Sequence, residues 1–132
     1  MSIPKHSSGW HPNRTVRIVD ENHKPSSREE CMNCPTTEDA IVVTPSVDLS
    51  AKKHTYRMTH VATGTALGPW LKSPTAVRNL ARQFWKSLPD DAKVTWRSSA
   101  DPFKVRASTP KSSLEILLQA YRDADQPKPG RL

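Results

Sequence analysis

Two cysteines and five histidines are the residues of this chain best suited to metal or redox chemistry. Cys31 and Cys34 form a C-x-x-C pair, which could supply half of a tetrahedral zinc site or a redox couple. A complete zinc site would need two further ligands from His6, His11, His23, His54 or His60. No βαβ pattern surrounds the pair, which argues against a thioredoxin-like motif. We interpret Cys31 and Cys34 as incidental thiols and predict neither a metal site nor a cofactor.

Residue patterns typical of catalysis are scarce. The chain contains no glycine-rich phosphate loop and no serine in a nucleophile elbow. His54 and His60 are six residues apart and would not share one face of a helix. The carboxylates of the second half fall at expected helix ends, where they have structural roles. We therefore predict that the protein is not an enzyme.

Positive charge is concentrated in the second half of the sequence. The chain has 132 residues and a formal net charge of +7, but residues 1–50 hold more acidic than basic side chains. The excess of lysine and arginine thus lies in residues 51–132, where helices are also expected. A small basic helical unit attracts polyanions, of which nucleic acid is the commonest. No apolar run approaches the roughly 18 residues of a membrane span, so no membrane partner is expected.

The segment from Ser73 to Ala100 carries the clearest helical pattern. Ser73 and Pro74 suit an N-cap and a first helical position, and Pro89 with the acidic residues behind it starts a second helix. Each helix presents a tryptophan to the junction, so the two helices should pack together. The residues expected in this small core are Val77, Ala81, Trp85, Leu88, Lys93, Trp96 and Ala100, and the apolar stripe of the first helix also contains Leu80 and Phe84.

The rest of the chain is expected to be helical or disordered, which makes the predicted fold class all-α. Residues 1–50 are interpreted as a mostly disordered arm, in which residues 15–19 and 40–44 are β-prone and could pair as a hairpin. We expect a first helix over 51–62 within a domain spanning 51–101. A basic linker over 102–112, a helix over 113–124 and a disordered tail over 125–132 should follow.

The helical segment resembles the second and third helices of a high-mobility-group (HMG) box. Six residues match the spacing of that family in order, and they are Trp85, Lys86, Leu88, Lys93, Trp96 and Ala100. Val77 and Ala81 stand where the family has apolar residues, whereas Pro89 replaces its usual serine or threonine. The resemblance covers about thirty residues and implies a small three-helix domain that docks in the DNA minor groove. Residues 100–104 and 117–125 also resemble fragments of the alpha-box of fungal mating-type activators.

Two functions from different classes follow from these patterns. The first is a nuclear DNA-binding protein of chromatin or transcription regulation, whose predicted phosphate contacts are Lys52, Lys53, Arg57, Arg78, Arg82, Lys86 and Arg97. Tyr56 and Met58 are expected to pack on the core rather than wedge between bases. The second is a small adaptor that binds a protein partner through a C-terminal amphipathic helix, with Leu114, Leu117, Leu118 and Tyr121 on its apolar face.

Overall fold

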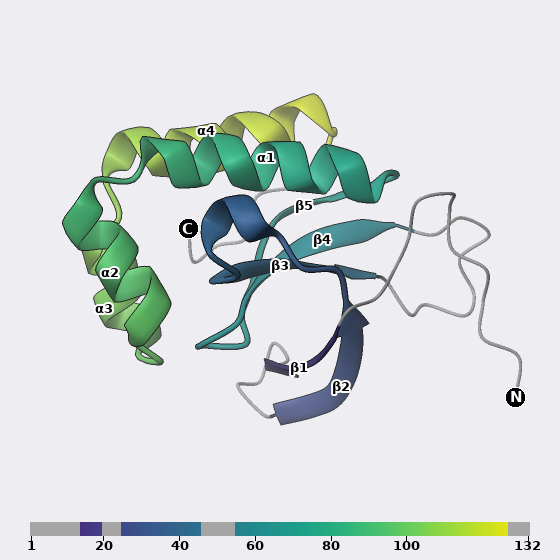
Figure 1. Cartoon of the computed structure of the whole chain (residues 1–132). Helices are drawn as coiled ribbons and strands as arrows, with labels where there is room; N and C mark the ends of the chain where they lie inside the picture. Colours follow the sequence, from purple (N-terminus) through teal and green to yellow (C-terminus); the bar gives the residue numbers. More distant parts are fainter. Residues whose placement is uncertain (1–13, 20–24, 46–54, 127–132) are drawn as a thin grey trace, which may run out of the picture.

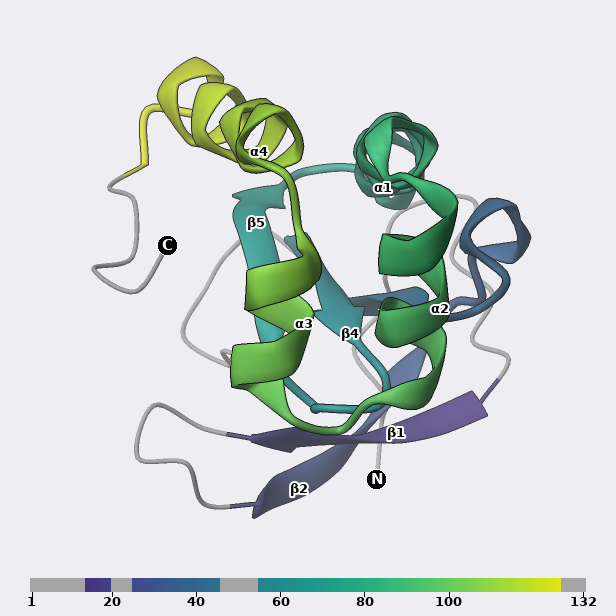
Figure 2. The same ribbon diagram turned by 90° about the vertical axis from the view of Figure 1, so that its left-hand side faces the viewer.

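The computed structural model describes residues 14–19, 25–45 and 55–126, and it is an α+β fold. Helices α1 and α4 lie side by side over one face of a sheet, while α2 and α3 stand at one end of it (Figures 1 and 2). The four helices span Pro74–Ser87 (α1), Asp90–Ser98 (α2), Pro102–Ser108 (α3) and Lys111–Asp123 (α4). The expectation of an all-α fold is therefore wrong.

The central sheet has three antiparallel strands in the order β3, β4, β5. These strands span Ile41–Pro45 (β3), Tyr56–His60 (β4) and Ala66–Leu71 (β5), and a short 3-10 helix, η1 at Pro35–Thr37, precedes β3. The first helix expected over 51–62 is replaced from Tyr56 onward by β4, while residues 51–54 lie outside the described part. The physical reason is strand pairing on both sides of β4, together with threonines and an aromatic that favour strands over helices.

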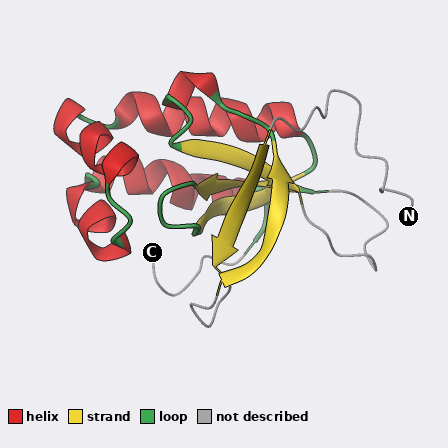
Figure 3. Cartoon of the chain, turned by 60° about the horizontal axis from the view of Figure 1, so that its bottom comes forward, coloured by secondary structure: helices red, strands yellow, loops and turns green. Residues whose placement is uncertain are grey.

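Strands also form within the segment that we expected to be an arm. Arg14–Val19 (β1) pairs with Pro25–Cys31 (β2) as an antiparallel hairpin, which lies on the side of the sheet away from α1 and α4 (Figures 1 and 3). The two β-prone runs are indeed strands, but they do not pair with each other. Met32 joins the hairpin to the sheet, because its amide donates to the Val43 carbonyl oxygen at 2.8 Å and its own carbonyl accepts from Val43 at 3.0 Å.

The hydrophobic core lies between the sheet and the helices. The apolar stripe of α1 faces inward as its spacing predicts, and residues of β3, β4, α2 and α4 pack against it. Its fully buried members include Ile41, Tyr56, Met58, Phe84 and Leu117. A smaller cluster of Val16, Cys31 and Val42 fills the space between the sheet and the hairpin.

The ends of the helices follow the local sequence. The Ser73 hydroxyl accepts a hydrogen bond from the Ala76 amide at 3.4 Å at the start of α1. Pro102, which we expected to end the second helix within a linker, is instead the first residue of α3, and the Asp101 carboxylate accepts from the Phe103 amide at 2.9 Å. Proline stops one helix and starts another here, because its missing N–H costs nothing in a first turn.

Trp96 joins α2 to three other elements. Its indole Nε1 donates to the Thr109 hydroxyl after α3 at 3.0 Å, and its ring meets the rings of His60 and Phe84 edge-on at centroid distances of 4.7 and 5.2 Å. Its side chain is almost fully buried. These contacts fix the angle at which α2 leaves the end of α1.

We predict that Trp96→Ala lowers the free energy of unfolding by about 3 to 5 kcal/mol, because it empties a large buried volume and orphans the Thr109 contact. Urea denaturation followed by circular dichroism measures this change. Val94→Ala, on the same helix but half exposed, is the matched control and should change stability by well under about 1 kcal/mol. Equal losses in the two variants would contradict the packing described here.

Candidate nucleic-acid interface

An open groove lies where α1, α2 and the loop after η1 meet. It encloses about 650 Å³ and contains four cationic and two anionic side chains. Trp85 and Val94 supply apolar surface to its wall. We call this site the basic groove and define it by its lining residues, which are Thr36, Glu38, Arg82, Trp85, Lys86, Asp90, Lys93, Val94 and Arg97.

The cations of the basic groove come from two helices set at an angle. Arg82 and Lys86 are one turn apart on α1, and both are exposed. Lys93 and Arg97 have the same spacing on α2, where Lys93 is half-buried and Arg97 is exposed. Spacing of four residues puts each pair about 6 Å apart along its helix, so each helix presents two cations to the groove. Asp90, the first residue of α2, also lines the groove and comes between the two pairs in the chain.

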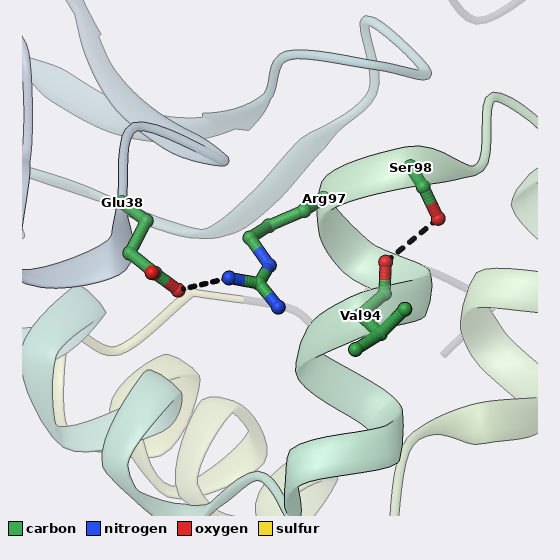
Figure 4. A network of polar contacts seen from close by, with 4 residues as sticks. All are labelled: Glu38, Val94, Arg97 and Ser98. Atoms are coloured by element: carbon green, nitrogen blue, oxygen red, sulfur yellow. Dashed lines mark hydrogen bonds and ion pairs between the residues drawn. The ribbon is translucent and has the colours of Figure 1, made fainter.

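The loop after η1 brings a carboxylate into this positive field. Glu38 Oε2 accepts a hydrogen bond from Arg97 Nη1 at 2.9 Å, and both side chains are about half exposed (Figure 4). Figure 4 shows the two side chains pointing toward each other across the space between the loop and α2. Because the pair is in contact with solvent, it contributes only about 0 to 1 kcal/mol to stability.

The loop that carries Glu38 has an unusual and well-supported backbone. Glu38 and Asp39 both have left-handed conformations, with φ of 54° and 58°. The buried Thr37 hydroxyl holds the loop, lying 2.8 Å from the Cys34 carbonyl oxygen and 3.0 Å from the Ile41 carbonyl oxygen. A left-handed non-glycine pair is uncommon and needs such support. The position of Glu38 is thus fixed by the fold.

The structure separates the residues that we expected to bind phosphate. Arg82, Lys86 and Arg97 line the basic groove, and Arg78 is exposed one turn before Arg82 on α1. Lys52 and Lys53 lie outside the described residues. Lys93, which we placed in the core by resemblance, belongs to the groove instead.

Arg57 lies away from the basic groove. Its guanidinium carbon is 5.2 Å from the centre of the Trp70 ring, and its Nη2 donates to the Tyr121 hydroxyl at 3.5 Å. Burial raises the pKa of Tyr121 above its ordinary value, and the charge of Arg57 opposes that rise. Arg57 is therefore part of the contact between β4, β5 and α4, and it is not in position to act with the groove cations.

Most of the other residues that we expected in the core are buried. Val77, Ala81, Trp85, Leu88 and Trp96 are buried, whereas Ala100 is exposed. On α4, Leu117 and Tyr121 are buried and Leu114 and Leu118 are half-buried. Leu117 thus packs on the protein's own core, and Leu114 and Leu118 keep part of their surface exposed.

The two cysteines lie in different apolar clusters. Cys34 belongs to the main core beneath the helices, and Cys31 belongs to the cluster beneath the β1–β2 hairpin. No group of three or more histidine, cysteine or acidic side chains in the described part of the chain could hold a metal ion. Within the same ranges, no helix has both the length and the apolar character needed to cross a membrane.

Sequence reasoning missed Glu38, which lines the basic groove, and two exposed amides on α1 that do not line it. Glu38 lies 59 residues before its partner Arg97 and falls in the segment expected to be an arm, so no local signal could have joined them. Asn79 and Gln83 are exposed on α1 beside the arginines. The four-residue spacing of these amides is visible in the sequence, but the prediction of DNA contacts considered only cationic side chains.

Comparison with known proteins gives no relative from which a function could be transferred. The chain matches no protein-family model, no curated protein and no solved structure. The resemblance to an HMG box therefore has no support from these comparisons, and the all-helical fold that it implied is wrong.

His60 lies beneath α2 and links the sheet to the helix that carries Arg97. Its Nε2 lies 2.6 Å from the Trp96 carbonyl oxygen, which can only accept, so Nε2 carries the proton and Nδ1 accepts from the Thr63 hydroxyl at 2.8 Å. Burial lowers the pKa of His60 below its ordinary value of 6.5, although the bond to Trp96 opposes the shift. The fold therefore favours the neutral imidazole.

We predict that stability falls as the pH drops below about 6.5, because the unfolded chain then binds a proton that folded His60 resists. The contribution is complete above the unfolded pKa and is lost progressively as the pH falls toward the lowered folded pKa. Urea midpoints between about pH 7.5 and 5.5 test this, in a window above most carboxylate titration.

His60→Gln should flatten this dependence, and its far-UV spectrum at pH 8 checks that it folds. Val94→Ala, which removes no titratable group from a half-exposed position of α2, is the control and should keep the slope of the parent chain. An unchanged slope in His60→Gln would refute the role assigned to His60.

Proposed function

We propose that this protein binds DNA, with the basic groove contacting the phosphate backbone. The observation that carries the proposal is the convergence of Arg82 and Lys86 from α1 with Lys93 and Arg97 from α2 on one open concavity. Cations gathered in a concave site raise the local concentration of a polyanion more than the same charges scattered over a surface.

The composition of the groove suits a phosphate backbone better than a small ligand. Its polar lining is mostly long, exposed and cationic, and the groove is open to solvent. Small-molecule sites are usually enclosed, so that they bury most of the surface of the ligand. Arg78 extends the line of charge along α1 beyond the groove, as contact with an extended polymer would require.

The proposal keeps the nucleic-acid partner expected from the sequence and drops the HMG-box architecture. The proposed function includes phosphate contact, nuclear localisation and a role in transcription or chromatin. Of these three, the basic groove supports only phosphate contact. The adaptor alternative has no comparable observation, because Leu117 and Tyr121 of α4 are buried.

We predict that Arg82→Gln with Lys86→Gln weakens binding to duplex DNA and makes it less sensitive to salt. Each lost phosphate contact should reduce the slope of log affinity against log salt by roughly 0.9. Fluorescence anisotropy between about 50 and 200 mM salt measures both quantities.

The matched control is Lys104→Gln with Arg106→Gln, which removes the same charge from exposed positions of α3 outside the groove. This control should keep the slope of the parent chain. The same loss of affinity and slope in both variants would show that binding depends on net charge rather than on the basic groove.

We further predict that Glu38→Gln strengthens DNA binding by about two- to fivefold, because it removes the anion that competes with phosphate for Arg97. Asp123→Asn, an equal change of charge on α4, is the control and should have a smaller effect. In an Arg97→Gln background, Glu38→Gln should lose most of its benefit. Equal gains from the two acidic positions would contradict a local role for Glu38.

A further inference from the structure

The outward face of α1 combines cations with side-chain amides and carries no carboxylate. None of its 14 residues is acidic, whereas α2 and α4 each carry carboxylates. The inward positions are taken by Val77, Ala81 and Phe84. Apart from Ala76, the exposed positions hold polar side chains, namely Thr75, Arg78, Asn79, Arg82, Gln83 and Lys86.

Two side-chain amides on this face lack a hydrogen-bonding partner among the described residues. Asn79 and Gln83 are exposed, one turn apart, and neither makes a side-chain hydrogen bond to the described residues. Other glutamines of the chain are used internally. Gln119 donates to Asp123 at 2.9 Å, and the Gln126 amide bonds to both the N–H and the carbonyl oxygen of Trp70.

An amide on an exposed helix flanked by arginines has the chemistry of base recognition. In the major groove, adenine presents an N7 acceptor beside an N6 amino donor, and the amide of asparagine or glutamine pairs with both. The major groove is about 12 Å wide and admits an α-helix. Four residues of helical rise place Asn79 and Gln83 about 6 Å apart along the axis, so the two can address different base pairs.

We propose that α1 lies in the DNA major groove, where Asn79 and Gln83 read adenines while Arg82 and Lys86 hold the neighbouring phosphates. The inference rests on the proposed function and deepens it from backbone contact to sequence readout. It assigns specificity to amides rather than charges, because phosphate contacts position a protein on DNA and base contacts specify the sequence. It also replaces the minor-groove docking that the HMG-box resemblance implied.

The basic groove supports this placement of α1. Arg82 and Lys86 belong both to the outward side of α1 and to the groove lining, so a phosphate strand held in the groove passes directly along that helix. The cations of α2 then contact the same strand from the far wall. Asn79 and Gln83 lie next to the cations of α1. When the phosphates of one DNA strand contact these cations, the two amides face the base edges in the major groove.

The test begins with selection of binding sites by the full chain from a random pool of duplex DNA. We expect an enriched site that contains adenine, bound about tenfold or more tightly than a scrambled duplex at the same salt. Asn79→Ala with Gln83→Ala should abolish this preference, so that the selected and scrambled duplexes bind equally. Gln119→Ala, which removes an exposed amide from α4, should keep the preference.

A substituted DNA identifies the atoms involved. Replacing the selected adenines by 7-deazaadenine removes the major-groove N7 acceptor and leaves base pairing and the minor groove intact. The parent chain should then lose about as much affinity as the amide variant loses on ordinary DNA. The amide variant should lose nothing more on the substituted DNA.

Each other outcome overturns the inference in a recognisable way. Binding without an enriched site would leave the proposed function standing and refute base reading. An enriched site whose preference survives Asn79→Ala with Gln83→Ala, or is indifferent to 7-deazaadenine, would place base reading outside the α1 amides. Failure to bind any duplex would refute the proposed function and this inference together.

Discussion

The packing of Trp96 is the interaction on which the arrangement of this molecule depends. α2 contains only nine residues, too few to be a stable helix in isolation. Trp96 supplies the missing stability through its hydrogen bond to Thr109 and its ring contacts with His60 and Phe84. These contacts tie one short helix to the sheet, to α1 and to the end of α3. The angle between α1 and α2, and with it the shape of the basic groove, follows from that anchorage.

The shape of the basic groove depends on the packing of Trp96 at one wall and on the conformation of the loop after η1 at the opposite wall. The loop after η1 is held by Thr37 and directs Glu38 at Arg97 from a left-handed backbone. The helical wall thus carries four cations and Asp90, and the loop contributes the second anion, Glu38. An exposed ion pair in this position adds little to stability, so its main consequence is electrostatic. The Glu38–Arg97 pair lowers the positive potential at the α2 end of the groove. Arg82 and Lys86 at the α1 end have no ion-pair partner among the described residues and can contact a phosphate.

Local signals in the sequence located α1 and α2 but could not give the sheet. Ser73–Pro74 and Pro89 marked real helix starts, and the stripe from Val77 to Leu88 is buried as its period required. The strand Tyr56–His60 exists because Ile41–Pro45 and Ala66–Leu71 pair with it, and such pairing is a property of distant segments. The polar strand Pro25–Cys31 has little strand propensity of its own and forms by pairing with Arg14–Val19. The residues of the groove likewise differ in how far the sequence predicts them. Helical spacing predicts that Arg82 and Lys86 share a face of α1, whereas no local pattern predicts that Glu38 lies near Arg97. A resemblance over thirty residues imposed an all-helical fold that these long-range pairings exclude.

The central claim is that DNA contacts the surface formed by α1 and α2, and NMR titration tests it most directly. Amide and side-chain signals of the labelled chain would be followed as a short duplex is added at low salt. The account predicts saturable shifts confined to α1, α2 and the loop carrying Glu38, including the indole of Trp85 in the groove wall. Shifts centred on the exposed face of α4 or on the β1–β2 hairpin, or no shifts at low salt, would contradict it.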